Sequence, residues 1–195
     1  MTKKRISKTN WLIIVTATVV TIYITEARAV DLDIGASAEF VPALSLTQTD
    51  IEFGSIQYTD GAGANDVTLG AADGALSCSN STEYDCPASA TPGSVGIVGG
   101  NGFAVNVFCS GSGTLSNGTE SLAMNNIEIA RDGSAVSCAG NGQTAFSYTI
   151  TGDAAQDTFN IGGNIEIPDT GVGEGGIFTT AASGGAAINV RVVYQ

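Results

Sequence analysis

The sequence contains no histidine, and its three lysines and its only tryptophan all lie within the first 11 residues. Serine and cysteine nucleophiles need a neighbouring base, most often histidine or lysine, to accept their proton. From residue 12 onward the chain lacks both bases, so we expect that it is not an enzyme. A pair of carboxylates could still act as acid and base, but no spacing singles out such a pair.

The first 29 residues have the pattern of a bacterial secretory signal peptide. A basic start at residues 3–8 precedes an apolar stretch at residues 11–24, and Ala-Arg-Ala at residues 27–29 is the small-residue pattern that signal peptidase recognises. We expect cleavage before Val30 and no membrane span in the mature chain. The alternative is an uncleaved membrane anchor, for which the apolar run is short.

The mature chain would be poor in positive charge. Residues 30–195 hold two basic residues, Arg131 and Arg191, against eighteen carboxylates, a net charge of about −16. Such a surface repels nucleic acids and anionic membranes, which excludes both as partners. The length of 166 residues suits one domain with a sizeable core.

Four cysteines, Cys78, Cys86, Cys109 and Cys138, form an even set in a chain that carries an export signal. This favours two disulfides, which have three possible connectivities. We predict Cys78–Cys86, closing a local loop, and Cys109–Cys138, joining two strand-like regions. Zinc is the alternative, but the paired C-x-x-C spacing is missing. We expect no metal and no cofactor.

Short runs of Val, Ile, Phe, Tyr and Thr alternate with Gly, Asn, Asp and Ser, and no window keeps an apolar stripe at helical spacing. The composition therefore predicts an all-β domain, a sandwich or a barrel. The glycine-rich stretches between the runs, such as GSGTLSNGTE at residues 111–120, predict turns. The expected strands are residues 32–40, 43–46, 51–57, 66–69, 95–98, 103–109, 126–130, 145–151, 159–167 and 186–194.

Both ends of the mature chain are amphipathic. In DLDIGASAEF every second residue is apolar, and the residues between them are acidic or small until Pro42 ends the run. The apolar face of this N-terminal strand consists of Leu32, Ile34, Ala36, Ala38 and Phe40. The C-terminal AINVRVVYQ has a corresponding face made of Ile188, Val190, Val192 and Tyr194.

DLDIGASAEFVPALSL resembles the N-terminal extension of chaperone–usher pilus subunits, in particular alpha-class fimbrial major subunits, and INVRVVYQ is similar to the closing strand of pilins. IEFGSI at residues 51–56, VTL at residues 67–69 and GGIF at residues 175–178 resemble a bacterial secreted pilin-like family of unknown function. This resemblance spans nearly all of the mature chain.

The resemblance implies an immunoglobulin-like β-sandwich that lacks its final strand. Residues 1–29 would be the signal peptide, residues 30–42 a donor-strand extension, and residues 43–195 the sandwich. The protein would be a structural subunit of a surface fibre, exported to the periplasm and then to the cell surface. Its expected partners are other copies of itself, a periplasmic chaperone and an outer-membrane usher. The C-terminal apolar face would line the acceptor groove or meet the chaperone.

Two other interpretations remain open at this point. The N-terminal strand could pair within its own chain and close an ordinary sandwich. A non-polymerising secreted domain could instead bind carbohydrate or a surface receptor through exposed aromatic residues.

Three further motifs predict no chemistry. Asp-Thr-Gly at residues 169–171 matches half of an aspartic-protease site, but that chemistry needs two such loops and Pro168 interrupts the strand, so we expect a polar turn. The acidic stretches at residues 60–66 and 153–157 do not fit the twelve-residue calcium loop. The acceptor sequences at Asn80 and Asn117 match N-glycosylation sites, which arise by chance in a bacterial chain.

Overall fold

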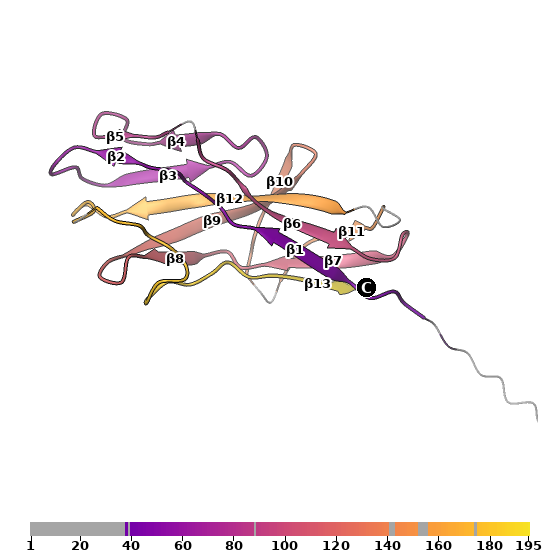
Figure 1. The fold of residues 1–195 in the computed structure, drawn as a ribbon. Coiled ribbons are helices and arrows are strands. Elements are labelled where there is room, and N and C mark those ends of the chain that lie inside the picture. The colour runs from indigo at the N-terminus through magenta and orange to yellow at the C-terminus, as the bar shows by residue number, and fades with distance from the viewer. Residues whose placement is uncertain (1–37, 39, 88, 141–142, 152–155, 174) are drawn as a thin grey trace, which may run out of the picture. The chain divides into compact units, whose positions relative to one another are not determined.

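The structure is a computed structural model that describes residues 38, 40–87, 89–140, 143–151, 156–173 and 175–195. The chain forms two compact units, Met1–Phe40 and Val41–Gln195. Only Ala38 and Phe40 of the first unit are described, so the N-terminal strand predicted at residues 32–40 lies almost wholly outside the described residues. The second unit is a β-sandwich, which confirms the predicted all-β fold (Figure 1).

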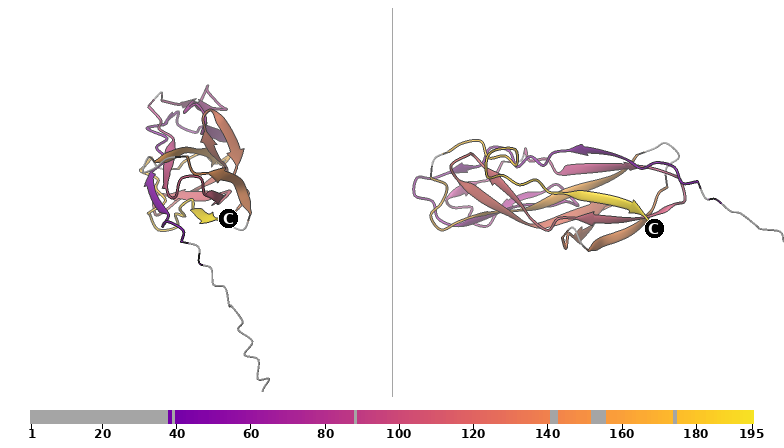
Figure 2. Two further views of the ribbon diagram at one scale, coloured as in Figure 1. Left: turned by 90° about the vertical axis from the view of Figure 1, so that its right-hand side faces the viewer. Right: turned by 90° about the horizontal axis from the view of Figure 1, so that it is seen from below.

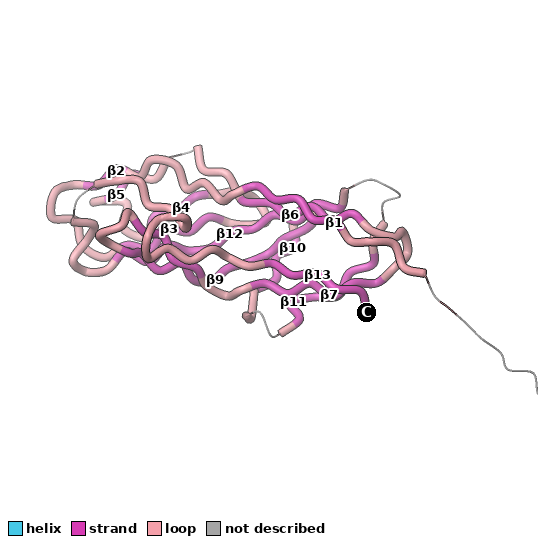
Figure 3. The backbone as a smooth tube through the Cα atoms, turned by 60° about the horizontal axis from the view of Figure 1, so that its bottom comes forward, coloured by secondary structure: helices cyan, strands magenta, loops and turns pink. Residues whose placement is uncertain are grey.

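The described residues contain strands and loops and no helix, as Figure 3 shows. The strands are β1 (Ser45–Thr49), β2 (Gln57–Tyr58), β3 (Asn65–Leu69), β4 (Leu76–Cys78), β5 (Tyr84–Asp85), β6 (Gly93–Val98), β7 (Ala104–Cys109), β8 (Gly113–Ser116), β9 (Ser121–Arg131), β10 (Ser134–Ser137), β11 (Thr144–Thr149), β12 (Asp157–Ile167) and β13 (Val190–Tyr194).

The larger sheet is organised around the long strand β12. One edge of β12 pairs first with β6 and then with β3, and its other edge pairs with β9. β1 pairs with β6 and β4 pairs with β3, while β8 and β10 pair with different halves of β9. The second sheet has three strands in the order β11-β7-β13, and β2 and β5 form a short separate pair.

Alternating sequence patterns place the core between the two sheets. In β7, Val105, Val107 and Cys109 are buried and the residues between them are half-buried. β3 follows the same pattern, with Val67 and Leu69 inward. In a strand successive side chains point to opposite faces, so this alternation aims one face of each sheet at the other. β12 is buried on most of its length because it is central in its sheet.

The strand predictions hold best where residues are β-branched and alternating, as in β3, β6, β7, β11, β12 and β13. Others were wrong in part. Of residues 51–57, only Gln57 lies in a strand, β2, and residues 51–56 form no more than a bridge between Glu52 and Thr91. The short strands β4, β5 and β10 were not predicted. Residues 113–116, expected within a turn, form β8, because β9 lies alongside and pairs with them.

Both ends of the sandwich unit lie at the same end of the domain. Gly99 lies between Leu44, just before β1, and Tyr194, the last residue of β13: a Cβ on this glycine would stand 2.8 Å from both side chains. The backbone N–H of Gly100 also donates a hydrogen bond of 3.0 Å to the Tyr194 hydroxyl. β1 therefore starts where β13 ends, and the two strands run in opposite directions (Figure 1).

Candidate functional site

A long groove lies between β1 and the C-terminal part of the chain. One wall is the continuous stretch of residues 46–56, and the other is formed by residues 175–180 and 187–190. The cavity has a volume of about 1080 Å³. Figure 3 looks towards this side of the domain, with β1 above and β13 below, and Figure 2 shows both strands running along the same flank.

The floor of the groove is the hydrophobic core itself. Val95 of β6, Met124 of β9, and Ile161 and Ile165 of β12 line it, and each is at least nine-tenths buried. These side chains belong to the core-facing side of the larger sheet. The groove thus reaches core side chains of the larger sheet, between walls formed by β1 and otherwise mostly by residues outside the named strands.

Apolar side chains also line the rim of the groove, at solvent-exposed positions where polar residues are more usual. Ile177 is 85% exposed, Leu46 43% and Tyr58 37%, and all three belong to the lining. Isolated exposed apolar residues are ordinary, but these three all line one groove, where a bound partner would cover them.

β1 lines the groove along most of its length and β13 reaches it only at Val190, and both are the last strands of their sheets. β1 pairs with β6 alone and β13 with β7 alone, in the pairing that the described residues make. Each strand therefore directs a row of backbone N–H and C=O groups away from its sheet. Such an edge is a template for another strand.

All four residues of the predicted C-terminal apolar face pack against the core. Ile188, Val190, Val192 and Tyr194 are all half-buried and pack against the core. Ile188 and Val190 line the groove, whereas Val192 and Tyr194 do not. Tyr194 instead packs edge-on against Phe103, with the ring centroids 5.7 Å apart, and so fastens the end of the chain.

Of the predicted N-terminal face, Leu32, Ile34 and Ala36 lie outside the described residues. Ala38 is exposed, and Phe40 is exposed over 88% of its surface. The sequence contained no direct signal for the floor residues Met124 and Ile165 as a site, since buried apolar residues of this type are common to every sandwich.

The opposite side of the sandwich, between β10 and β11, contains the main charged cluster. Nη2 of Arg131 lies 3.1 Å from Oδ1 of Asp157, and its guanidinium stacks over the Tyr148 ring, 4.4 Å from the centroid. Burial alone would raise the pKa of Asp157, but hydrogen bonds from Thr151 and Tyr148 and the charge of Arg131 together lower that pKa below 3.8.

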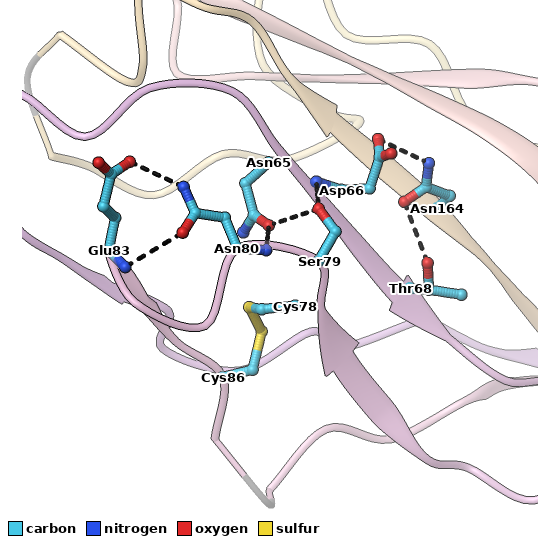
Figure 4. Close-up of a disulfide and its surroundings, with 9 residues drawn as sticks. All are labelled: Asn65, Asp66, Thr68, Cys78, Ser79, Asn80, Glu83, Cys86 and Asn164. Carbon is cyan, nitrogen blue, oxygen red and sulfur yellow. Dashed lines mark hydrogen bonds between the residues drawn. A yellow bond between two sulfur atoms is a disulfide. The ribbon is translucent and has the colours of Figure 1, made fainter.

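The two predicted disulfides are present, Cys78–Cys86 and Cys109–Cys138, which confirms the favoured connectivity. Cys109–Cys138 joins the end of β7 to the residue after β10. Cys78–Cys86 closes the loop between β4 and β5, where Asn65 accepts hydrogen bonds from Ser79 and from the backbone of Asn80 (Figure 4). Two disulfides indicate an exported protein in an oxidising compartment.

The other sequence motifs do not form a site. Asp169 is exposed in a turn closed by a 2.8 Å hydrogen bond from Gly171 N–H to the Pro168 carbonyl, which confirms the predicted turn. Within the described residues, no group of three or more His, Cys, Asp or Glu side chains is arranged to hold a metal ion. No helix in that same part of the chain has the length and apolar character needed to cross a membrane.

Comparison with known proteins connects this fold to one family. No curated protein matches the sequence. A family model described as a domain of unknown function, DUF4402, matches residues 44–192, which include both walls and the floor of the groove. Because that match covers most of the chain and nearly all of the β-sandwich, the protein belongs to the DUF4402 family.

Proposed function

We propose that this protein is a structural subunit of a bacterial surface fibre that assembles by donation of a β-strand. In this proposal residues 1–29 are removed on export. Residues 30–42 of one copy then insert into the groove of the next copy, and the fibre supports adhesion. A periplasmic chaperone would cover the groove before an outer-membrane usher assembles the subunits. The protein would have no enzymatic activity.

The observation that carries the proposal is the groove between β1 and the segment that leads into β13, with core side chains on its floor and an edge strand of each sheet beside it. A strand inserted there would gain backbone hydrogen bonds from the edges and bury its side chains on the floor, which is the β-strand addition mode of recognition. At about 1080 Å³ the groove is at the upper limit of small-molecule pockets, which span roughly 300–1,000 Å³. An extended peptide suits it better than a small ligand.

The N-terminal segment has the chemistry that this groove requires. Its apolar face would meet the apolar floor, while Asp31, Asp33 and Glu39 on its other face would remain in water. Burial of Leu32, Ile34 and Phe40, with part of the two alanines, contributes roughly 6–10 kcal/mol before the cost of ordering the strand. This is enough for a durable joint between copies.

The test compares two charged substitutions in the mature chain, Ile34→Asp on the apolar face and Ser37→Asp on the polar face. We expect Ile34→Asp to abolish polymers, because a carboxylate cannot be buried on the floor, and Ser37→Asp to leave them intact. Polymer length is measured by size-exclusion chromatography and electron microscopy.

Deletion of residues 30–41 provides an independent arm. We expect a monomer whose melting temperature rises when a synthetic peptide of residues 30–41 is added, and does not rise with the Ile34→Asp peptide. A wild-type protein that is always a stable monomer, or a deletion variant that polymerises as well as wild type, contradicts the proposal.

A further inference from the structure

The two ends of the groove have different chemistry. Along β1 and just past its end the lining is aliphatic: Leu46 lies in β1, Val95 pairs with Gln48, and Ile161 pairs with Gly93. At the other end it is aromatic, with Tyr58 of β2 and Tyr84 of β5. Figure 1 shows the β2–β5 pair at the opposite end of the domain from the C-terminus of β13, so the groove has a direction that an occupant could recognise.

At the aromatic end, one tyrosine is fixed in place and the other is accessible to a ligand. Tyr84 is buried, and its hydroxyl donates a 2.6 Å hydrogen bond to the Gly63 carbonyl, which holds the ring in place. Tyr58 packs against it with the ring centroids 6.2 Å apart, but is itself 37% exposed. Gly175 lies beside Tyr58: a Cβ added there would stand 3.4 Å from the Tyr58 hydroxyl. An incoming aromatic ring would therefore find a stacking partner that is accessible.

The N-terminal segment has the same asymmetry. Its only aromatic residue is Phe40, at its C-terminal end, and its large aliphatic residues, Leu32 and Ile34, are at its start. Phe40 is the most exposed large apolar side chain among the described residues. Aromatic pairs contribute beyond the area that they bury, so the matched ends favour one orientation of the strand over the other.

We propose that the Tyr58–Tyr84 end of the groove is the binding site for Phe40 of a neighbouring copy, so that the donated strand runs antiparallel to β13 and parallel to β1. This inference rests on the proposed function, since it specifies the orientation in which the donated strand binds in the same groove. Leu32 and Ile34 of the donor then lie at the aliphatic end, over Val95 and Ile161.

This orientation determines the kind of assembly. The donor's own sandwich would follow Phe40 and emerge beyond the β2–β5 end, whereas the acceptor's own N-terminal extension leaves from the start of β1, at the opposite end. Each copy then receives at one end and donates from the other, a heterologous contact that continues as an open fibre. The reverse orientation would place both at the same end and permit a closed, reciprocally exchanged dimer.

Cysteine cross-linking in the full mature chain tests the orientation. All four native cysteines are in disulfides, so two added cysteines report on each other. Val41→Cys, just after Phe40, is combined either with Gln57→Cys at the aromatic end or with Gln48→Cys at the aliphatic end. Both glutamines are exposed strand residues, which makes the two variants a matched pair.

We expect a ladder of disulfide-linked oligomers with Gln57→Cys and little cross-linking with Gln48→Cys. The opposite result, or covalent dimers without higher oligomers, overturns the inference. If neither pair cross-links while polymers form, the inference fails and the proposed function stands. If no polymer forms and Ile34→Asp has no effect, the proposed function itself fails.

A double-mutant cycle tests the aromatic contact separately. Phe40→Leu and Tyr58→Leu are each expected to speed dissociation of polymers, and their combination should show a coupling of about two- to tenfold in rate. Phe40→Leu combined with Leu46→Ala is the control, because residues at opposite ends of the groove should act independently. Equal coupling in both cycles, or none in the first, overturns the assignment of Phe40 to the aromatic end.

Discussion

The two sides of this sandwich differ in how its sheets are held together. Between β10 and β11 the sheets are joined by Cys109–Cys138 and by the cluster of Arg131, Tyr148 and Asp157. Between β1 and β13 neither disulfide joins the two walls, and a groove lined by core side chains runs along this side. We call the cross-linked side between β10 and β11 the closed side, and the side between β1 and β13 the open side. The difference shows that this chain can cross-link one side of its sandwich, and that the open side is specific to the first and last strands of the domain.

The closed side should be the costly one to break. Replacing Cys109 and Cys138 with alanine removes a cross-link across 29 residues, and we expect a loss of about 3–4 kcal/mol in the free energy of unfolding. The matched control replaces Cys78 and Cys86, which are 8 residues apart, with an expected loss of about 2–3 kcal/mol. Urea unfolding of the mature monomer measures both, and a larger loss in the control would contradict this view of the closed side.

The charged cluster should have the next largest effect. Arg131→Met keeps much of the packing over Tyr148 but leaves the carboxylate of Asp157 buried without its cation, at an expected cost of about 1–3 kcal/mol. Asp132, the other carboxylate near Arg131, is almost fully exposed. We therefore expect Asp132→Asn to change the free energy of unfolding by less than about 0.5 kcal/mol. Equal losses in the two variants would show that the buried pair has no special role.

The same cluster predicts how stability depends on pH. The pKa of Asp157 is lower in the folded protein than its ordinary value of 3.8, so the folded state favours its ionised form. Its contribution is complete above the unfolded pKa, and is lost as the pH falls through the folded pKa. Unfolding followed from pH 5 to pH 2 should show this loss in wild type. The Asp157→Asn variant should lack this component, and an unchanged pH profile in that variant would contradict the assignment.

The open side should be the cheapest to change in an isolated subunit. Leu46→Ser and Ile177→Ser remove exposed rim side chains, and we expect changes below about 0.5 kcal/mol in the stability of the monomer. Their effect should appear only when a strand occupies the groove, as faster dissociation of polymers. Ala123→Ser, at an exposed position of β9 outside the groove lining, is the control and should affect neither quantity.

Much of the fold could be read from local patterns. Val105, Val107 and Cys109 alternate with half-buried residues as expected for a strand on a core, and the two disulfides follow from the even set of cysteines and its spacing. β8 could not be read in this way, since Gly-Thr-Leu-Ser has weak strand character and becomes a strand only because β9 lies beside it. Residues 51–56 show the reverse case: their composition favours a strand, but apart from the bridge between Glu52 and Thr91 no neighbouring strand pairs with them.

The sequence by itself determined that this is an acidic all-β protein with two disulfides and with amphipathic runs at residues 31–40 and 187–195, because these properties depend on residue type and on a period of two along the chain. Only the tertiary structure decided that β1 and β13 become the outermost strands of different sheets, and that a groove down to Met124 and Ile165 lies between the walls that they border. That outcome depends on which strands pair across the chain, a choice made by long-range packing and backbone hydrogen bonds rather than by any single segment.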